Sequence, residues 1–198
     1  MFNPSFLTLA EVDALADRLH AGQVDKAGLP YINHPRAVAA ALEGLGLEVQ
    51  AAALLHDAIE DTEATAETLL AARVDPAAVR LVGQVTRPEG EGRPTYRDWV
   101  WNLSHPASYA EPVDFLAPEV LDSLGLKYSV RIPKAAALKL ADNAHNSRHE
   151  RQAVLPEPVS VGLTRRYSRT RASLIPVVTP DLARLIFSRI NPGLLVEV

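Results

Sequence analysis

Apolar residues recur every three or four positions along most of the chain, which places them on one face of an α-helix. Capping residues and prolines mark several helix starts, such as Thr8 with Glu11 and Asp75 with Pro76. We therefore predict helices over residues 9–21, 35 to 44 or 46, 48–61, 65–73, 76–86, 96–103, 134–148, 159–178 and 180–190. No stretch alternates as a β-strand does, so the pattern predicts one all-α domain built as a compact helical bundle over residues 1–198.

The segment over residues 104–133 departs from this pattern, because it combines several prolines with mixed polarity. A helix is predicted within it at residues 118–124. We interpret the segment as an insertion over the helical core, in the position of a lid.

Composition narrows the classes of protein that this chain can represent. A net charge of −4, with acidic and basic residues mixed, gives no broad field for nucleic acid. The short basic stretch of Arg165, Arg166, Arg169 and Arg171 reads as a solvated helix face. Cysteine is absent, which excludes disulfides and thiolate metal sites. The first residues lack the basic start and apolar core of a signal peptide, and no apolar run approaches the roughly 18 residues that span a membrane, so we expect a cytoplasmic protein.

Residues 52–62, which read A-A-L-L-H-D-A-I-E-D-T, carry the strongest chemical signal. An apolar helix here ends in one imidazole and three carboxylates, at His56, Asp57, Glu60 and Asp61. Like charges three or four positions apart on a helix repel, and acids near a helix C-terminus oppose its dipole. A divalent cation relieves these penalties, so the pattern favours a functional site.

Four positions form a plausible set of metal ligands: His34, His56, Asp57 and Asp142. Two imidazoles and two carboxylates suit Mn²⁺, Fe²⁺, Zn²⁺ or Mg²⁺. Taken alone, His34 before Pro35 also fits a simple turn residue, and Asp142 also fits an ion-paired helix acid. The combination of four is far more specific than any one of its members.

Three motifs together resemble the HD-domain phosphohydrolases. They are H-A-G-Q-V-D-K-A-G-L-P-Y-I-N-H-P (residues 20–35), A-A-L-L-H-D-A-I-E-D-T (52–62) and K-L-A-D-N-A-H-N-S-R (139–148). Within that superfamily they look like the hydrolase domain of Rel/Spo alarmone enzymes and the small single-domain alarmone hydrolases. The motifs follow the family's order and cover the chain from about residue 8 to 151, with an insertion before the third.

The resemblance implies roles for particular residues. The metal, usually Mn²⁺, is held by His34, His56, Asp57 and Asp142, and water is oriented and activated by Glu60 and Asp61. Family positions near the substrate match Lys26, Tyr31, Asn146 and Arg148. His20 and Gln23 are expected to support the loop or a ligand rather than to touch the metal. His145 and His149 are expected at the surface or the pocket rim.

The implied reaction removes the 3′-pyrophosphate of guanosine tetra- or pentaphosphate, the alarmones of the stringent response, to give GDP or GTP. At this length we expect no accompanying alarmone synthetase domain. Asp25 departs from the family pattern, which has a basic residue that packs against the guanine base. A carboxylate there loses a cation–π contact of ~0.5–2 kcal/mol. Two alternatives therefore stay open: hydrolysis of another nucleotide or phosphorylated cofactor, and a nucleotide sensor with weak catalysis.

Overall fold

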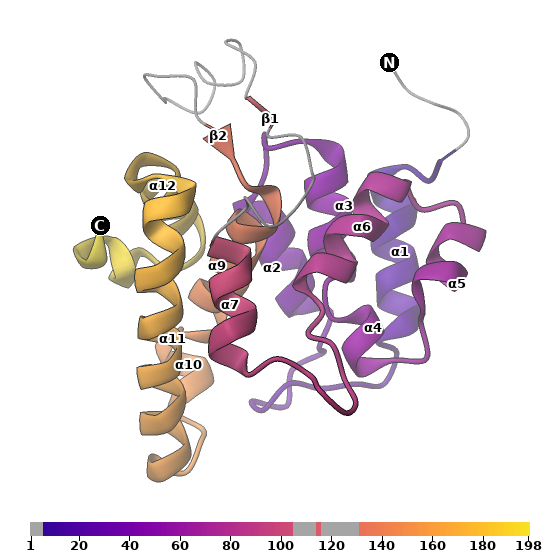
Figure 1. Cartoon of the computed structure of the whole chain (residues 1–198). Helices are drawn as coiled ribbons and strands as arrows, with labels where there is room; N and C mark the ends of the chain where they lie inside the picture. The colour runs from indigo at the N-terminus through magenta and orange to yellow at the C-terminus, as the bar shows by residue number, and fades with distance from the viewer. Residues whose placement is uncertain (1–5, 105–113, 116–130) are drawn as a thin grey trace.

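A computed structural model of the protein describes residues 6–104, 114–115 and 131–198. The helices are α1 (Leu9–Leu19), α2 (Asn33–Ala41), α3 (Leu47–Leu55), α4 (Ala58–Asp61), α5 (Ala66–Ala71), α6 (Pro76–Val85), α7 (Tyr96–Ser104), α9 (Lys134–Asn146), α10 (His149–Gln152), α11 (Glu157–Val178), α12 (Pro180–Ile190) and the 3₁₀ helix η2 (Pro192–Glu197). The predicted all-α fold is confirmed (Figure 1).

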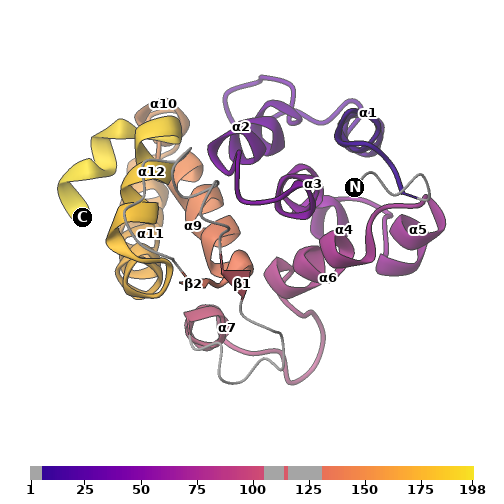
Figure 2. The same ribbon diagram turned by 90° about the horizontal axis from the view of Figure 1, so that it is seen from above.

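Two groups of helices meet along a central boundary. Seen from above in Figure 2, α1, α3, α4, α5 and α6 lie on one side, and α9, α11 and α12 lie on the other. α2 bridges the two groups, because it packs against α3 as well as α9 and α12. The start of α2, the end of α3 and the middle of α9 therefore come together where the groups join.

The buried residues of α3 and the small side chains of α9 place these two helices at the boundary. Almost every side chain of α3 from Val49 to Leu55 is buried, as its nearly continuous apolar sequence predicted. α9 is rich in alanine, and its buried residues include Ala136, Ala137, Ala141 and Ala144. Small side chains let neighbouring helices approach closely, so the polar residues carried by α9 can reach residues of α2 and α3.

The structure corrects the predicted single helix over residues 48–61. The chain turns at His56 and Asp57, and this turn separates α3 from α4. Successive residues of a continuous helix point about 100° apart. At the turn, the side chains of His56 and Asp57 instead both reach His34, with His56 Nε2 3.0 Å from Asp57 Oδ2.

Two short strands accompany the helices in the described part of the chain. Two-residue strands β1 (Asp114–Phe115) and β2 (Arg131–Ile132) pair antiparallel, with Asp114 opposite Ile132. Each strand is too short to show the alternation that identifies a strand in a sequence. The predicted helix at 118–124 lies outside the described residues. Among the helices that the structure describes, none combines the length and apolar character needed to cross a membrane.

Candidate functional site

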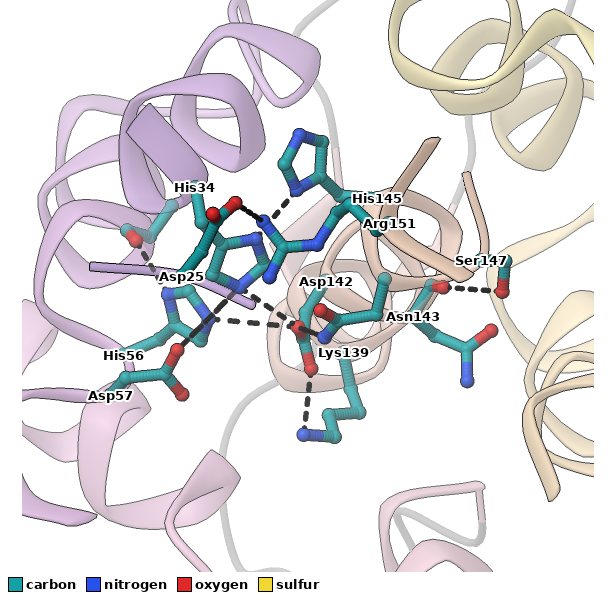
Figure 3. A network of polar contacts seen from close by, with 12 residues as sticks. Asp25, His34, His56, Asp57, Lys139, Asp142, Asn143, His145, Ser147 and Arg151 are labelled. Atoms are coloured by element: carbon teal, nitrogen blue, oxygen red, sulfur yellow. Dashed lines mark hydrogen bonds and ion pairs between the residues drawn. The ribbon is translucent and has the colours of Figure 1, made fainter. Parts of the chain in front are cut away.

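Two imidazoles and two carboxylates converge where the two groups of helices meet. Oδ2 of Asp57 lies 3.5 Å from Nε2 of His34 and 3.0 Å from Nε2 of His56. Oδ1 of Asp142 lies 3.2 Å and 3.7 Å from the same two nitrogens. Figure 3 shows the four side chains pointing toward one another from α2, from the turn after α3 and from α9. The structure thus brings together all four residues predicted as metal ligands.

The geometry of His56 leaves one nitrogen for a cation. Nδ1 of His56 lies 2.8 Å from the backbone oxygen of Ala53, which can only accept a hydrogen bond. Nδ1 therefore carries a proton, and Nε2 faces the centre of the cluster, where a cation that displaces its proton can take the lone pair. Metal-binding histidines commonly donate their second nitrogen to a carbonyl in this way.

His34 is oriented by a residue that the sequence reading placed elsewhere. His145 is buried rather than at the surface or the pocket rim, and its Nδ1 lies 2.7 Å from Nδ1 of His34. Burial, followed by the nearby His34 and Arg151, lowers the pKa of His145 to about 3. A neutral His145 can accept the proton of His34 Nδ1, which leaves Nε2 of His34 facing the cluster.

The charge balance of the cluster follows from its burial. Burial alone raises the pKa of a carboxylate, yet the imidazole of His56 holds the pKa of Asp57 well below its usual range. Burial likewise opposes a charged His56, but Asp57 and Asp142 outweigh it and raise the His56 pKa to about 10. The carboxylates therefore stay ionised and attract positive charge to this point. A divalent cation fits the same place, because the candidate ligand atoms of His34, His56 and Asp57 lie within 4.8 Å of one another.

Asp142 is shared between the cluster and two neighbours on α9. Its Oδ1 faces the histidines and accepts a hydrogen bond from Nδ2 of Asn146, one helical turn away. Its Oδ2 forms a 2.7 Å ion pair with Lys139, whose ammonium also lies 4.9 Å from the ring centroid of Trp99. Burial lowers and Asp142 raises the pKa of Lys139, with a net upward shift, so this lysine remains a cation.

Glu60 and Asp61 lie on α4, one turn beyond the histidine–carboxylate cluster. Oε1 of Glu60 accepts the backbone N–H of Arg87 at 2.6 Å. Oδ2 of Asp61 accepts the hydroxyl of Tyr31 at 3.3 Å, and the same hydroxyl donates to Asp57 at 2.6 Å. Partial burial raises the pKa of both Glu60 and Asp61. A raised pKa brings a carboxylate closer to the range in which it serves as a general base at neutral pH.

A cavity of about 310 Å³ opens beside the cluster. Its walls come from the loop before α2, from α4, and from the end of α9 through α10 into α11. They include Val24, Asp25, Lys26, Ala27, Tyr31, Asp61, Asn146, Arg151, Gln152, Leu155 and Tyr167. The volume is at the lower end of the range for small-molecule sites. Asp61 and Tyr31 connect this cavity to the metal-ligand set, because both are joined by hydrogen bonds around Asp57.

Three of the four residues predicted to contact substrate line this cavity: Lys26, Tyr31 and Asn146. Arg148 does not, because its guanidinium pairs with Glu150 at the surface, with 2.5 Å between Nη2 and Oε1. The predicted supporting role of Gln23 agrees with its contacts. Oε1 of Gln23 accepts a hydrogen bond from Nδ1 of His20 at 2.8 Å, and Nε2 of Gln23 donates to the backbone oxygen of Asp61.

Several residues of the site escaped the sequence reading: His145, Lys139, Arg151 and Tyr167. Lys139 and His145 did carry a signal, since each lies three residues from Asp142 on a predicted helix. Arg171, assigned to a solvated face, is instead buried and paired with Glu197 and Asn143. This network fixes the end of α9 against α11 and η2.

Comparison with known proteins places this geometry in a family. Residues 13–108 match the model of the HD domain. The chain is 34% identical over 140 residues to a GTP pyrophosphokinase of Streptomyces coelicolor, which is 68% of this chain and 14% of that protein. It is 51% identical over 57 residues to the guanosine-3′,5′-bis(diphosphate) 3′-pyrophosphohydrolase of Haemophilus influenzae, which is 28% of this chain and 8% of that protein.

A solved structure extends the likeness over the whole fold. It is described as a metazoan ortholog of SpoT that hydrolyses ppGpp, and it matches with a TM-score of 0.62 at 22% identity, covering 98% of this chain and 99% of its own. Residues 13–108 therefore carry an HD domain. Within that class, its relatives are of the Rel/Spo type, as the three motifs predicted. The chain spans only about a seventh or less of the curated relatives cited here.

The contact between His34 and His145 gives a testable prediction. His145→Phe keeps an aromatic ring but removes the acceptor for His34 Nδ1–H, so the affinity for a divalent metal ion should fall by roughly 10–100-fold. His145→Asn keeps a side-chain oxygen near the same place and should lose less metal affinity than His145→Phe. Calorimetric titration of Mn²⁺ into each variant measures both changes. Equal affinity in wild type and His145→Phe would show that His145 does not orient the metal ligand.

Proposed function

We propose that this protein is a Mn²⁺-dependent phosphohydrolase that removes the 3′-pyrophosphate of guanosine tetra- or pentaphosphate, in the cytoplasm. The observation that carries the proposal is the convergence of His34, His56, Asp57 and Asp142 beside a cavity that Asp61 lines. The names of the Rel/Spo-type relatives support guanosine tetraphosphate as the substrate.

The proposed mechanism assigns separate tasks to the cluster and to α4. His34, His56, Asp57 and Asp142 would hold a divalent cation, which would supply Lewis-acid activation of the phosphoryl group and of water. Asp61, at the cavity wall, accepts a proton from the attacking water, and Glu60 supports it from the same helix turn. The Tyr31 hydroxyl links the two carboxylates, because it donates to Asp57 at 2.6 Å and lies 3.3 Å from Oδ2 of Asp61. The water oxygen bonds to the phosphorus, the bond between phosphorus and the 3′-oxygen of the ribose breaks to release pyrophosphate, and the 3′-oxygen takes up a proton.

The second candidate is the same hydrolytic chemistry on another nucleotide or phosphorylated cofactor. The carboxylate of Asp25 on the cavity wall is the observation that favours this second candidate. A sensor without catalysis fits less well, because Glu60 and Asp61 are both placed beside the cluster.

A substrate panel tests the proposal. The protein, loaded with Mn²⁺, is expected to release pyrophosphate from guanosine tetraphosphate faster than phosphate or pyrophosphate from other nucleotides. The measurement is kcat/KM over the panel, with magnesium in place of manganese as a comparison of metals. Intact guanosine tetraphosphate alongside rapid turnover of another phosphate ester would reject the alarmone assignment in favour of the second candidate.

A further inference from the structure

Asp25 and Arg151 form an ion pair on the cavity wall that the proposed mechanism does not use. Nη1 of Arg151 lies 3.1 Å from Oδ2 of Asp25, and both residues line the cavity. The two side chains are largely removed from solvent, with exposed fractions of 9% for Asp25 and 18% for Arg151. Figure 3 shows the pair in the same polar network as His34 and His145, although 126 positions separate the two residues in the chain.

Asp25 is held rigidly by its own loop. Its Oδ1 accepts the backbone N–H groups of Ala27 at 2.9 Å and Leu29 at 3.0 Å, and its backbone N–H donates to the oxygen of Leu29. With Oδ1 committed to the loop and Oδ2 to Arg151, the carboxylate has little capacity left for a substrate group. Its position suits an anchor for the guanidinium better than a direct contact to the base.

Arg151 has donors to spare. It lies on α10, where the side chain of Gln152 fixes the segment by donating to the backbone oxygen of Asn146. A guanidinium carries five N–H donors, and within the described part of the chain the hydrogen bond to Asp25 is the one found for this side chain. The remaining donors are available to oxygen atoms in the cavity.

The charges along the cavity separate into two regions. Asp61 and Tyr31 are linked to the metal-ligand set through Asp57, so the reacting phosphate group belongs at that end. Lys26 and Arg151 supply the cationic side chains of the cavity lining, from the loop and from α10. A ligand with a second anionic group, besides the one that reacts, complements this arrangement.

We propose that Arg151, held in position by Asp25, binds the 5′-diphosphate of the nucleotide, the group that is not cleaved. This inference rests on the proposed function. A planar guanidinium forms two parallel hydrogen bonds to phosphate oxygens, which a lysine cannot reproduce. Arg151 is then a specificity-determining residue, and the acidic Asp25 is a positioning residue rather than an obstacle to binding an anion.

Substitution of Arg151 tests its binding role by kinetics. Arg151→Gln is expected to raise KM for guanosine tetraphosphate by roughly 10–100-fold, the scale of a hydrogen bond to a charged group. The value of kcat should hardly change, because the contact is the same in ground and transition states. Arg151→Lys should have a KM between those of wild type and Arg151→Gln. Arg184→Gln, which breaks an exposed ion pair on α12 with Asp181, is the matched control and should change neither constant.

Ligand binding identifies the group that Arg151 contacts. Calorimetry on the Mn²⁺-loaded protein compares GDP, which carries the 5′-diphosphate, with guanosine, which does not. Arg151→Gln should weaken GDP binding by the same factor by which it raises KM, and it should leave guanosine binding unchanged. An equal loss for both ligands would place Arg151 at the base or ribose and overturn the proposal, as would unchanged GDP binding.

The role of Asp25 is tested by Asp25→Asn, whose oxygen can still accept the two loop amides while the charge partner of Arg151 is removed. Weaker GDP binding is expected, because the guanidinium loses its fixed position. Tighter binding would show that Asp25 acts by repelling the ligand and would overturn its positioning role.

Failure of this inference differs from failure of the proposed function. Wild-type protein that hydrolyses guanosine tetraphosphate while Arg151→Gln keeps the same KM refutes the inference alone. Wild-type protein that leaves guanosine tetraphosphate intact refutes the function, and absent GDP binding in that protein refutes the inference as well.

Discussion

His56→Ala and Asp142→Asn are expected to remove stable Mn²⁺ binding and, with it, hydrolytic activity. Each variant deletes one of four ligand groups that meet within a few ångströms, and His56 and Asp142 are both buried. Metal binding to the folded state raises stability by mass action, so wild type should melt at a higher temperature with Mn²⁺ than without it. Both variants should lose this metal-dependent increment.

The rise in melting temperature caused by Mn²⁺ is a better measure of metal binding than the melting temperature itself. Asp142→Asn also takes the carboxylate from the buried ammonium of Lys139, which destabilises the fold without any metal. Metal content by elemental analysis and melting temperature with and without Mn²⁺ separate the two effects. Asp13→Asn, which breaks a part-exposed ion pair with Arg36, is a matched control that should keep its metal. Full metal content in both ligand variants would contradict the proposed site.

Glu60→Gln and Asp61→Asn are expected to lower kcat by ~10²–10⁴ while Mn²⁺ stays bound, the scale for a lost general base. The larger loss should follow Asp61→Asn, because Asp61 lines the cavity whereas the Glu60 carboxylate accepts the backbone N–H of Arg87. Single-turnover kinetics together with metal analysis measure the two properties.

The outcomes for these variants discriminate between mechanisms. Near-normal kcat in both would mean that another group activates the water. Loss of metal from either would make that residue a ligand. A larger fall in Glu60→Gln than in Asp61→Asn would reverse the order of roles inferred from the cavity lining.

Sequence alone determined the fold class of this protein and the four residues that we propose as metal ligands. The apolar spacing of its helices and the capping residues at Thr8 and Asp75 are local properties, and each acts within one turn of the chain. The sequence indicated a functional site at His56 and Asp57 because ionisable residues at the end of an apolar helix conflict with helix energetics. Motif order then linked these residues to His34 and Asp142.

Only the tertiary structure decided which residues surround those ligands. His145 lies 111 positions from His34, and its burial depends on how α9 packs against α2. After α3 the chain turns at His56 and Asp57, and both side chains contact His34 from α2, a contact that helix propensity does not encode.

Asp25 shows most clearly that the sequence does not reveal long-range contacts. From the sequence, its carboxylate is an unfavourable charge beside an anionic substrate. In the fold it is the partner of Arg151, 126 positions away, and the pair presents a guanidinium to the cavity. Charge at one position is local information, whereas the charge that a ligand meets depends on every chain segment that lines the cavity.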